Sequence, residues 1–254
     1  MLFGEYLFMS NQIARNALYS EIGVILPTYG EANNIGRLID DIESLDLNAS
    51  ILVIDDSSPD GTGEIVLQQQ NKYPNVSLYS RPKKSGLGSA ITDGFKYFLS
   101  IPNPPEYVFT MDADYSHDPK DMPKLLAAIK EDNCGIIIGS RYADGGQIVG
   151  WPLSRKIVSR TANSIARSCL GLNLKDCTAG FRCYSTTFLK ETVACLHSQT
   201  YEIQIETVRQ AALRNFEVKE IPVIFVNRKR GKSKLTWSEI KSYISYTFKA
   251  IFRS

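Results

Sequence analysis

The sequence predicts an α/β protein with a mostly parallel, Rossmann-like sheet flanked by helices. Apolar runs of strand length alternate with segments of helical pattern, which is typical of parallel strands joined by right-handed crossovers. A cluster of polar residues follows each of the first five apolar runs. Because ligands of such sheets bind beyond the carboxyl ends of the strands, the fold class also predicts that these clusters converge on one cleft.

The expected elements follow one another in a regular order. We expect strands over residues 22–27, 51–55, 76–80, 107–111 and 135–139, and helices near 34–45, 61–73, 87–100 and 119–131. In the second half we expect a helix over 154–170, a loop over 175–184, helices near 186–196 and 201–214, and a strand over 218–226. We interpret both halves as one domain spanning 21–235, between an N-terminal extension (1–20) and an amphipathic C-terminal helix (236–254).

Composition limits the class of protein. The chain has 254 residues, of which 43% are hydrophobic and 22% charged, enough apolar material for one large domain. The cysteines form no CxxC pair and the two histidines lie far apart in sequence, which argues against a structural zinc site. No window approaches the roughly 18 apolar residues of a membrane span, so we expect no transmembrane helix and no signal peptide.

The stretch FTMDADYSHDP (109–119) carries the first candidate site. Asp112 and Asp114 follow a predicted strand at a spacing of two, which directs both carboxylates to one side. Such hard oxygen ligands suit Mg²⁺ or Mn²⁺, which usually take one or two carboxylates together with phosphate oxygens. The pair therefore indicates a nucleoside diphosphate as the third party, although a solvated turn would also accommodate two aspartates.

Two further strand ends add polar groups. Asp55 and Asp56 close the second strand, and they fit contacts to a base or ribose better than helix capping alone. Lys83 and Lys84 precede a Gly-rich helix start, where they would either attract an anion or simply be solvated. That stretch, KKSGLGSA, matches neither a P-loop nor a dinucleotide fingerprint, which argues against an NTPase or a dinucleotide-dependent oxidoreductase.

The second half is rich in arginine. Arg141, Arg155, Arg160 and Arg182 have few acidic residues near them in sequence, which favours a second anionic substrate gripped by guanidinium groups over purely structural ion pairs. Surface arginines that merely solubilise the protein are the alternative. His117 is expected to form local hydrogen bonds rather than to bind a metal.

The C-terminal segment is strongly basic. From Arg228 onward it holds eight Lys or Arg against Glu239 alone. Trp237 and the apolar residues after it recur at helical spacing in 236–254, which fits either a helix packed on the core or an interfacial membrane helix. Nucleic acid is not an expected partner, because no base-stacking motif accompanies the basic run.

These motifs resemble glycosyltransferase family 2 enzymes of the GT-A fold, and within that family the catalytic subunits of dolichyl-phosphate mannosyltransferases. The resemblance spans about residues 22–245. It rests on LPTYGEANNI (26–35), IDDSSPDGT (54–62) and MDADYSHDP (111–119), followed in order by GSRY, GWPLSRKIVSR, TAGFR and RKRGKSKL. Gly30 departs from the Asn usual in the first motif, and Ser116 stands where some relatives carry a metal-binding Gln.

The resemblance implies roles for individual residues. Asp112, Asp114 and Arg141 would be catalytic, with Asp112, Asp114 and Ser116 holding Mg²⁺ or Mn²⁺. The donor-binding residues would be Pro27, Tyr29, Glu31, Ile54, Asp56, Asp112, Ala113, Asp114, Arg228 and Lys234. Arg141 and Arg155 would bind the acceptor phosphate, with the C-terminal half of the domain forming the acceptor side.

The implied reaction is an inverting transfer of mannose from GDP-mannose to dolichyl or another polyprenyl phosphate. Other polyprenyl-phosphate glycosyltransferases, such as a glucosyltransferase that uses a different sugar nucleotide, are the alternative within the class. A sugar-nucleotide-binding scaffold subunit is the non-enzymatic alternative. The resemblance also implies a location on the cytoplasmic face of a membrane (the endoplasmic reticulum in a eukaryote, the plasma membrane in a prokaryote) and small membrane subunits as partners.

Overall fold

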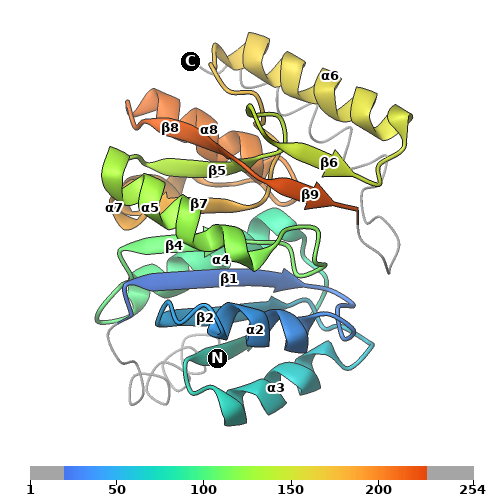
Figure 1. The fold of residues 1–254 in the computed structure, drawn as a ribbon. Coiled ribbons are helices and arrows are strands. Elements are labelled where there is room, and N and C mark those ends of the chain that lie inside the picture. The colour runs from blue at the N-terminus through green and yellow to red at the C-terminus, as the bar shows by residue number, and fades with distance from the viewer. Residues whose placement is uncertain (1–19, 228–254) are drawn as a thin grey trace.

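The computed structural model describes residues 20–227 of the chain. They form a seven-stranded sheet in the order β3-β2-β1-β4-β7-β5-β8, with helices on both faces (Figure 1). Strands β6 and β9 form a separate two-stranded sheet. The architecture is therefore the mostly parallel, helix-flanked sheet that the sequence predicts.

The first half alternates strands and helices as expected. Its elements are β1 (Ile22–Thr28), α2 (Ile35–Glu43), β2 (Ala49–Asp55), α3 (Thr62–Lys72), β3 (Val76–Ser80), α4 (Leu87–Ser100), β4 (Tyr107–Thr110), a short 3-10 turn (Pro119–Asp121), α5 (Met122–Asp132) and β5 (Ile136–Ser140). Strand β1 pairs in parallel with β2 and with β4, and β2 pairs in parallel with β3. The loops that follow β1, β2 and β4 consequently leave the sheet at the same edge.

The second half contains β6 (Gln147–Val149), α6 (Leu153–Leu170), β7 (Arg182–Ser185), α7 (Thr186–Thr192), a 3-10 turn (Val193–Cys195), α8 (Ile203–Leu213), β8 (Val218–Pro222) and β9 (Ile224–Val226). The expected single strand over 218–226 is wrong, because the chain changes sheets at Val223. The Val223 N–H donates to the Ser140 carbonyl at the end of β5, while its carbonyl accepts from Gln147 at the start of β6. Strand β8 therefore extends the main sheet, and β9 pairs with β6.

The expected loop over 175–184 is also wrong at its end, where β7 inserts antiparallel between β4 and β5. This strand begins with Arg182, whose side chain is fully buried. The guanidinium donates to the carbonyls of Cys177, Ala179 and Gln204 and to the Thr207 hydroxyl, at 2.7–2.8 Å. The strand was not predicted because its first residue is charged. In the structure, hydrogen bonds to these four oxygens compensate the guanidinium for its burial in the core.

Two hydrophobic layers cover the sheet. On one face, Val24 and Leu26 of β1 pack in a cluster with α2 and α5. On the other face, Ile25 packs in a cluster with α4, α7 and α8. Because neighbouring residues of one strand point to opposite faces, β1 is apolar from Ile22 to Pro27, as expected for a strand buried on both sides.

The division into a domain over 21–235 and two flanking segments stays a prediction. Ser20 is buried, and its hydroxyl donates to the Ile22 carbonyl at 2.8 Å. The predicted boundary at 235 and the predicted helix over 236–254 lie outside the described residues. None of the helices within 20–227 is both long and apolar enough to cross a membrane.

The contact between α4 and the loop before α8 yields a stability prediction. A Cβ on Gly88 would lie 2.5 Å from the Ser198 carbonyl oxygen and 2.7 Å from that of Thr200, and these backbone atoms cannot move aside like a side chain. Gly88→Ala should therefore lower the free energy of unfolding by about 1–3 kcal/mol, measured by urea titration.

Gly63→Ala is the matched control, since Gly63 is also the second residue of a helix. The nearest atom to a Cβ there is Leu78 Cδ2 at 3.8 Å, so this variant should be neutral or stabilised by up to about 1 kcal/mol. Equal stabilities of the two variants would show that the approach of the loop to α4 imposes no such constraint.

Candidate active site

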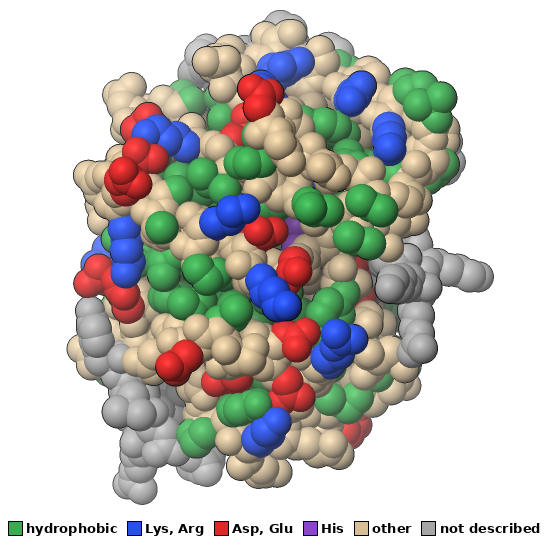
Figure 2. Space-filling model, in the orientation of Figure 1, with side chains coloured by type: hydrophobic (Ala, Val, Ile, Leu, Met, Phe, Trp, Pro, Cys, Tyr) green, Lys and Arg blue, Asp and Glu red, His purple; other side chains and the backbone are tan. Residues whose placement is uncertain are grey.

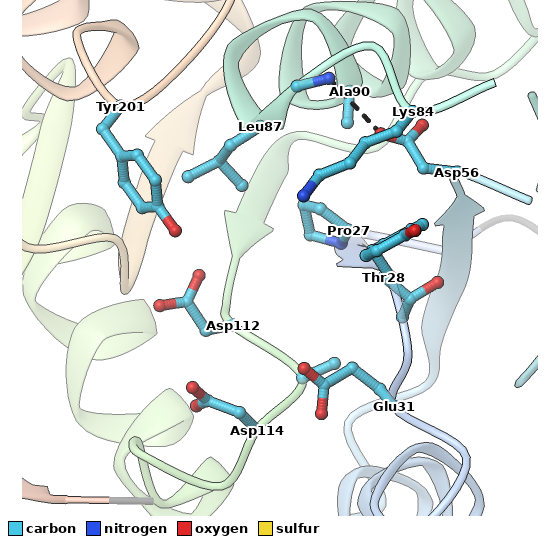
Figure 3. Close-up of a pocket in the computed structure, with 13 residues that line it drawn as sticks. Pro27, Thr28, Glu31, Asp56, Lys84, Leu87, Ala90, Asp112, Asp114 and Tyr201 are labelled. Atoms are coloured by element: carbon cyan, nitrogen blue, oxygen red, sulfur yellow. Dashed lines mark hydrogen bonds between the residues drawn. The ribbon is translucent and has the colours of Figure 1, made fainter. Parts of the chain in front are cut away.

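A cleft that is partly open to solvent lies at the carboxyl ends of β1, β2 and β4. The residues that line it are Pro27, Thr28, Tyr29, Glu31, Asp56, Lys84, Gly86, Leu87, Ala90, Asp112, Ala113, Asp114 and Tyr201 (Figure 3). Four of the five polar clusters predicted to converge contribute to it; the exception is the cluster after β5, which contains Arg141.

The loop after β1 is tied to the loop after β2. The backbone N–H groups of Gly30, Glu31 and Ala32 donate to Ser58 Oγ, Thr62 Oγ1 and Asp60 Oδ2 at 2.9–3.1 Å. Gly30 adopts a φ of 71°, a left-handed conformation that glycine takes without strain. These bonds place Tyr29 and Glu31 at the cleft, where Asn34 Nδ2 donates to Glu31 Oε2 at 2.9 Å.

Asp55, the last residue of β2, and Asp56, which follows it, have different roles. Asp55 is a structural residue, because its carboxylate accepts from the Thr28 hydroxyl and from the backbone and hydroxyl of Ser58. Asp56 lines the cleft and pairs with the buried Arg81, with 2.5 Å between Asp56 Oδ1 and Arg81 Nε. Asp56 Oδ2 also accepts from the N–H groups of Ser85 and Gly86, which fixes the loop that leads into α4.

One cation lines the cleft beside these acids. The Lys84 ammonium lies 4.5 Å from the centre of the Tyr29 ring, a cation–π distance, and both side chains border the opening. Figure 3 shows Lys84 in the part of the cleft nearest Asp56. Lys84 and Tyr29 thus line the same side of the opening.

Asp112 and Asp114 lie in the loop after β4 rather than within the strand, and both line the cleft. Asp114 is 7% exposed, and its Oδ1 accepts from the Ser116 N–H at 3.0 Å, which fixes the carboxylate. Tyr115, which lies between Asp114 and Ser116 in the sequence, has a φ of 58°. Its hydroxyl donates to Asp41 Oδ2 at 2.6 Å. Figure 3 shows the Asp112 carboxylate opposite the Tyr201 hydroxyl, with Glu31 beside Asp114.

The donor set suits a divalent cation that arrives with a phosphate. Within residues 20–227, no three His, Cys, Asp or Glu side chains gather as a metal-binding group. The lining does hold four acidic side chains against Lys84 as its one cation, counted over the described residues. Two carboxylates completed by diphosphate oxygens are a coordination typical of Mg²⁺ and Mn²⁺, so Asp112 and Asp114 fit such an ion.

The neighbouring Ser116 and His117 are buried behind this loop. Within the described chain, Ser116 Oγ and His117 Nδ1 are buried atoms with no hydrogen-bond partner. The His117 ring packs against Phe181 and Phe225, with centroids 5.3 and 5.0 Å away. Burial, followed by the charge of Arg141, lowers the pKa of His117 to about 4, so it is neutral at physiological pH.

Arg141 is held by a carboxylate from a distant part of the chain. Its Nε and Nη2 each lie 2.7 Å from an oxygen of Asp176, and its backbone N–H donates to the same group. The sequence argument that the arginines lack acidic partners is therefore wrong for Arg141, because 35 residues separate the pair. Burial would lower the pKa of Arg141, but the charge and hydrogen bonds of Asp176 outweigh this and raise it.

Like Arg141, the other arginines of the predicted cluster do not line the cleft. Arg182 is an internal structural residue, as described above. Arg155 stacks on Trp151, with its Cζ 4.1 Å from the ring centre, and donates to Asn227 Oδ1 at 3.2 Å. Arg160 is exposed and lies 5.8 Å from the centre of the Tyr142 ring.

The structure thus divides the predicted site residues into three groups. Those that line the cleft are Pro27, Tyr29, Glu31, Asp56, Asp112, Ala113 and Asp114, whereas Ile54, Ser116, Arg141 and Arg155 do not line it. Ile54 is a core residue in the cluster under α4. Arg228 and Lys234 lie outside the described residues.

Sequence reasoning did not single out Tyr201, which lines the cleft, or Arg81, which holds the cleft residue Asp56. Tyr201 is brought there by the loop before α8, and Arg81 orients Asp56 from the end of β3. The signal for Arg81 was a single basic residue directly after a buried strand. For Tyr201 there was none, because its position depends on packing across the sheet.

The sequence matches a known family over most of its length. Residues 23–193 match the model of "Glycosyl transferase family 2". An undecaprenyl-phosphate mannosyltransferase of Micrococcus luteus is 37% identical over 217 residues, which cover 84% of this chain and 86% of that protein. A polyprenol monophosphomannose synthase of Mycolicibacterium smegmatis is 36% identical, covering 86% of this chain and 82% of that protein.

This chain belongs to glycosyltransferase family 2. The resemblance found in its motifs is therefore confirmed, and the chain is a glycosyltransferase.

Solved structures show the same fold. Glucosyl-3-phosphoglycerate synthase of Mycobacterium tuberculosis, in complex with Mn²⁺, UDP and its product, has a TM-score of 0.64 at 16% identity, covering 96% of this chain and 82% of that one. A mannosyltransferase of Pyrobaculum calidifontis, in complex with GDP-Man and Mn²⁺, has a TM-score of 0.63 at 16% identity, covering 99% and 73%. The predicted GT-A fold is confirmed.

The buried Arg141–Asp176 pair yields a second prediction. Asp176→Asn would leave the guanidinium in the interior without a carboxylate, so the free energy of unfolding should fall by about 3–5 kcal/mol in a denaturant titration. The double variant Arg141→Met, Asp176→Leu removes both charges and should cost less than Asp176→Asn alone.

An exposed ion pair provides the control. Lys175 Nζ lies 2.6 Å from Asp144 Oδ1, but the side chains are 49% and 97% exposed. Asp144→Asn should therefore cost about 1 kcal/mol or less. A loss for Asp176→Asn no larger than that of Asp144→Asn would contradict the structural role given to the buried pair.

Proposed function

We propose that this glycosyltransferase transfers mannose from GDP-mannose to dolichyl or another polyprenyl phosphate, with inversion at the anomeric carbon. The observation that carries the proposal is the acid-rich cleft at the ends of β1, β2 and β4, in which Asp112 and Asp114 face the same opening. Support for mannose and for a polyprenyl phosphate comes from the relatives at 36–37% identity, whose names state both.

The nucleotide would occupy the part of the cleft between the loops after β1 and β2. Tyr29 and Lys84 form one wall there, and Asp56, oriented by Arg81, offers carboxylate oxygens to base or ribose donors. Pro27 and Glu31 complete this side, and Ile54 would act by packing from the core beneath it. Arg228 and Lys234, outside the described residues, are proposed to reach the donor phosphates.

Mg²⁺ or Mn²⁺ would be held by Asp112 and Asp114, with Ser116 as a third proposed ligand. When bound, the ion supplies positive charge that offsets the carboxylates and the leaving diphosphate. In this chain the Ser116 backbone N–H fixes the Asp114 carboxylate, and the loop before α8 brings the Tyr201 hydroxyl opposite Asp112.

The acceptor phosphate is assigned to Arg141 and Arg155. Nε and Nη2 of Arg141 donate to Asp176, so Nη1 is the guanidinium nitrogen that would contact a phosphate. Because the pair holds the guanidinium in place, Arg141 would act mainly as a fixed positive charge. Its charge interacts with that of Asp112, which places it within electrostatic reach of the cleft. Aligned substrates and fixed charges are the two effects that this arrangement offers to catalysis.

The chemistry needs no dedicated base. A phosphate monoester has a second pKa of about 6, so the acceptor is largely a dianion at neutral pH. A phosphate oxygen would attack the anomeric carbon while the bond from that carbon to the GDP oxygen breaks, and GDP leaves with the electron pair. The products are polyprenyl phosphate mannose and GDP, with no proton left to remove.

The alternative donor is a different sugar nucleotide. A synthase with the same fold has been solved with UDP bound, so the fold is compatible with a uridine nucleotide. A scaffold subunit that only binds sugar nucleotides is the non-enzymatic alternative, which the intact pair Asp112 and Asp114 disfavours. The protein would work at the cytoplasmic face of a membrane, where small membrane subunits are proposed partners and nucleic acid is not.

A transfer assay with a matched control tests the proposal. The chain is incubated with radiolabelled GDP-mannose, Mn²⁺ and detergent-dispersed polyprenyl phosphate, and label is counted in the organic phase. Asp114→Asn should lower transfer by about 100-fold or more, because a positioned charge is lost from the site. Asp118→Asn, an exposed cap in the same loop, should stay within about twofold of wild type, since an amide can still accept from the Lys120 N–H.

The outcomes separate the alternatives. Label from UDP-glucose but not from GDP-mannose would keep the site and replace the donor. Equal transfer by wild type and Asp114→Asn at saturating Mn²⁺ would remove Asp114 from the mechanism, and no transfer from either donor would favour a scaffold.

A further inference from the structure

We propose that Tyr115 is a positioning residue for the divalent ion. Its hydroxyl, bonded to Asp41 of α2, holds the loop that carries Asp112 and Asp114 in the shape that receives the metal. The inference rests on the proposed function for the ion itself. It adds α2, none of whose side chains lines the cleft, to the parts of the chain that determine how tightly the ion binds.

The loop after β4 turns sharply at Tyr115. Asp114 Oδ1 accepts from the Ser116 N–H at 3.0 Å, and Tyr115 between them has a φ of 58°. A residue with a Cβ takes this left-handed conformation at a cost, because the Cβ crowds the carbonyl oxygen that follows it. Contacts outside the loop must therefore hold Tyr115 in place.

Helix α2 supplies those contacts. The Tyr115 hydroxyl donates to Asp41 Oδ2 at 2.6 Å, and the Arg37 guanidinium carbon lies 5.2 Å from the centre of the tyrosine ring. Arg37 Nε lies 3.7 Å from the same Asp41 oxygen, since the two residues are one turn apart on the helix. Tyr115 also packs against the hydrophobic cluster that contains residues of α2 and α5. We call Arg37, Asp41 and Tyr115 the α2 clamp.

The same helix is attached to a second acidic residue of the cleft. The Glu31 carbonyl accepts from the N–H groups of Asn34 and Ile35 at the start of α2, each at 2.9 Å. Figure 3 shows Glu31 beside Asp114, and two carboxylates in such a position repel each other until a cation binds. Because the α2 clamp holds the loop from outside, it resists that repulsion and leaves less reorganisation for the moment when the ion arrives.

The α2 clamp lies at the surface rather than inside the cleft. The side chains of Arg37 and Asp41 are 79% and 40% exposed. Figure 2 shows acidic and basic side chains close together over the region that α2 occupies in Figure 1. None of the three clamp side chains lines the cleft, so they can be replaced without removing a group assigned to a substrate.

A second tyrosine is bonded to the same helix and provides a matched control. The Tyr73 hydroxyl donates to Asp40 Oδ1 at 2.9 Å, and the Lys72 ammonium lies 4.7 Å from the centre of its ring. Tyr73 therefore has the same kinds of contact as Tyr115: a carboxylate of α2 and a cation over the ring. It follows α3, however, and its φ of −127° is an ordinary extended conformation.

Mn²⁺ binding tests the inference without turnover. The full chain is titrated with MnCl₂ in the presence of GDP and, separately, of UDP, and free Mn²⁺ is measured by its electron paramagnetic resonance signal. Tyr115→Phe keeps the ring but loses the bond to Asp41, so it should weaken Mn²⁺ binding by about tenfold, the lower end of the effect of residues that orient metal ligands. Tyr73→Phe should bind Mn²⁺ as wild type does, although both variants should lower the midpoint of a urea titration to a similar extent.

Variants of Asp41 separate position from charge. Asp41→Asn keeps an oxygen that accepts from the Tyr115 hydroxyl, so it should retain Mn²⁺ binding to within about twofold. Asp41→Ala should weaken binding about as much as Tyr115→Phe. An equal loss in the two Asp41 variants would show that the charge of Asp41 attracts the ion, and the positioning role would be overturned.

Tyr115→Gly tests whether the left-handed turn needs to be held. Glycine takes this conformation without strain but has no side chain for α2 to hold, so Mn²⁺ binding should again fall by about tenfold or more. Wild-type binding by this variant would contradict the proposal, because the loop would then keep its shape without the α2 clamp.

The inference and the proposed function fail separately. Weaker Mn²⁺ binding by Tyr115→Phe than by Tyr73→Phe, in a chain that transfers no mannose, would leave the α2 clamp in place and remove the function. Mannose transfer together with equal Mn²⁺ binding by the two variants would do the reverse. A wild-type chain that binds no Mn²⁺ with either nucleotide would overturn the inference and the metal role proposed for Asp112 and Asp114.

Discussion

The buried guanidinium of Arg182 is the interaction on which the second half of the domain depends. Its bonds to the carbonyls of Cys177, Ala179 and Gln204 join the loop before β7 to the first turn of α8. A charge this deep is tolerated only when its donors are bonded. By meeting that requirement, the chain inserts an antiparallel strand between β4 and β5 and fixes α8. The loop that precedes this helix carries Tyr201 to the cleft.

The same principle shapes the cleft itself. Arg81 forms an ion pair with Asp56, and Arg141 forms one with Asp176; both carboxylates come from distant parts of the sequence. Buried pairs of this kind contribute less to net stability than their Coulomb attraction suggests, because both charges are desolvated. Their benefit is position, since bonded groups keep one orientation. The cleft therefore has fixed charges around it, the condition under which electrostatic stabilisation of a transition state is most effective.

The sequence predicts what is local and misses what is assembled across the sheet. The apolar run ILVID of β2 and the spacing of Asp112 and Asp114 suffice to predict a parallel sheet and carboxylates at one edge, because periodicity and strand direction determine both. The Arg141–Asp176 pair was not predictable from proximity in sequence, nor was the burial of Arg182. Both depend on loops that only the β4-β7-β5 order brings together. The break at Val223 was not predictable, because the apolar run from Ile221 to Val226 continues across it.

Charge near the cleft explains why the described residues need help to bind two anions. Glu31, Asp56, Asp112 and Asp114 line it against Lys84, so a sugar nucleotide meets net negative potential unless cations accompany it. A divalent ion is one source. A second proposed source is the basic run that begins at Arg228. It follows directly on Asn227, whose backbone N–H donates to the Val149 carbonyl and whose side chain accepts from Arg155. The residue from which the basic segment extends is therefore fixed beside Trp151 and Arg141. We therefore propose that the acid-rich cleft relies on added positive charge to bind a sugar nucleotide, from a divalent ion and from the basic residues that follow Asn227 in the sequence.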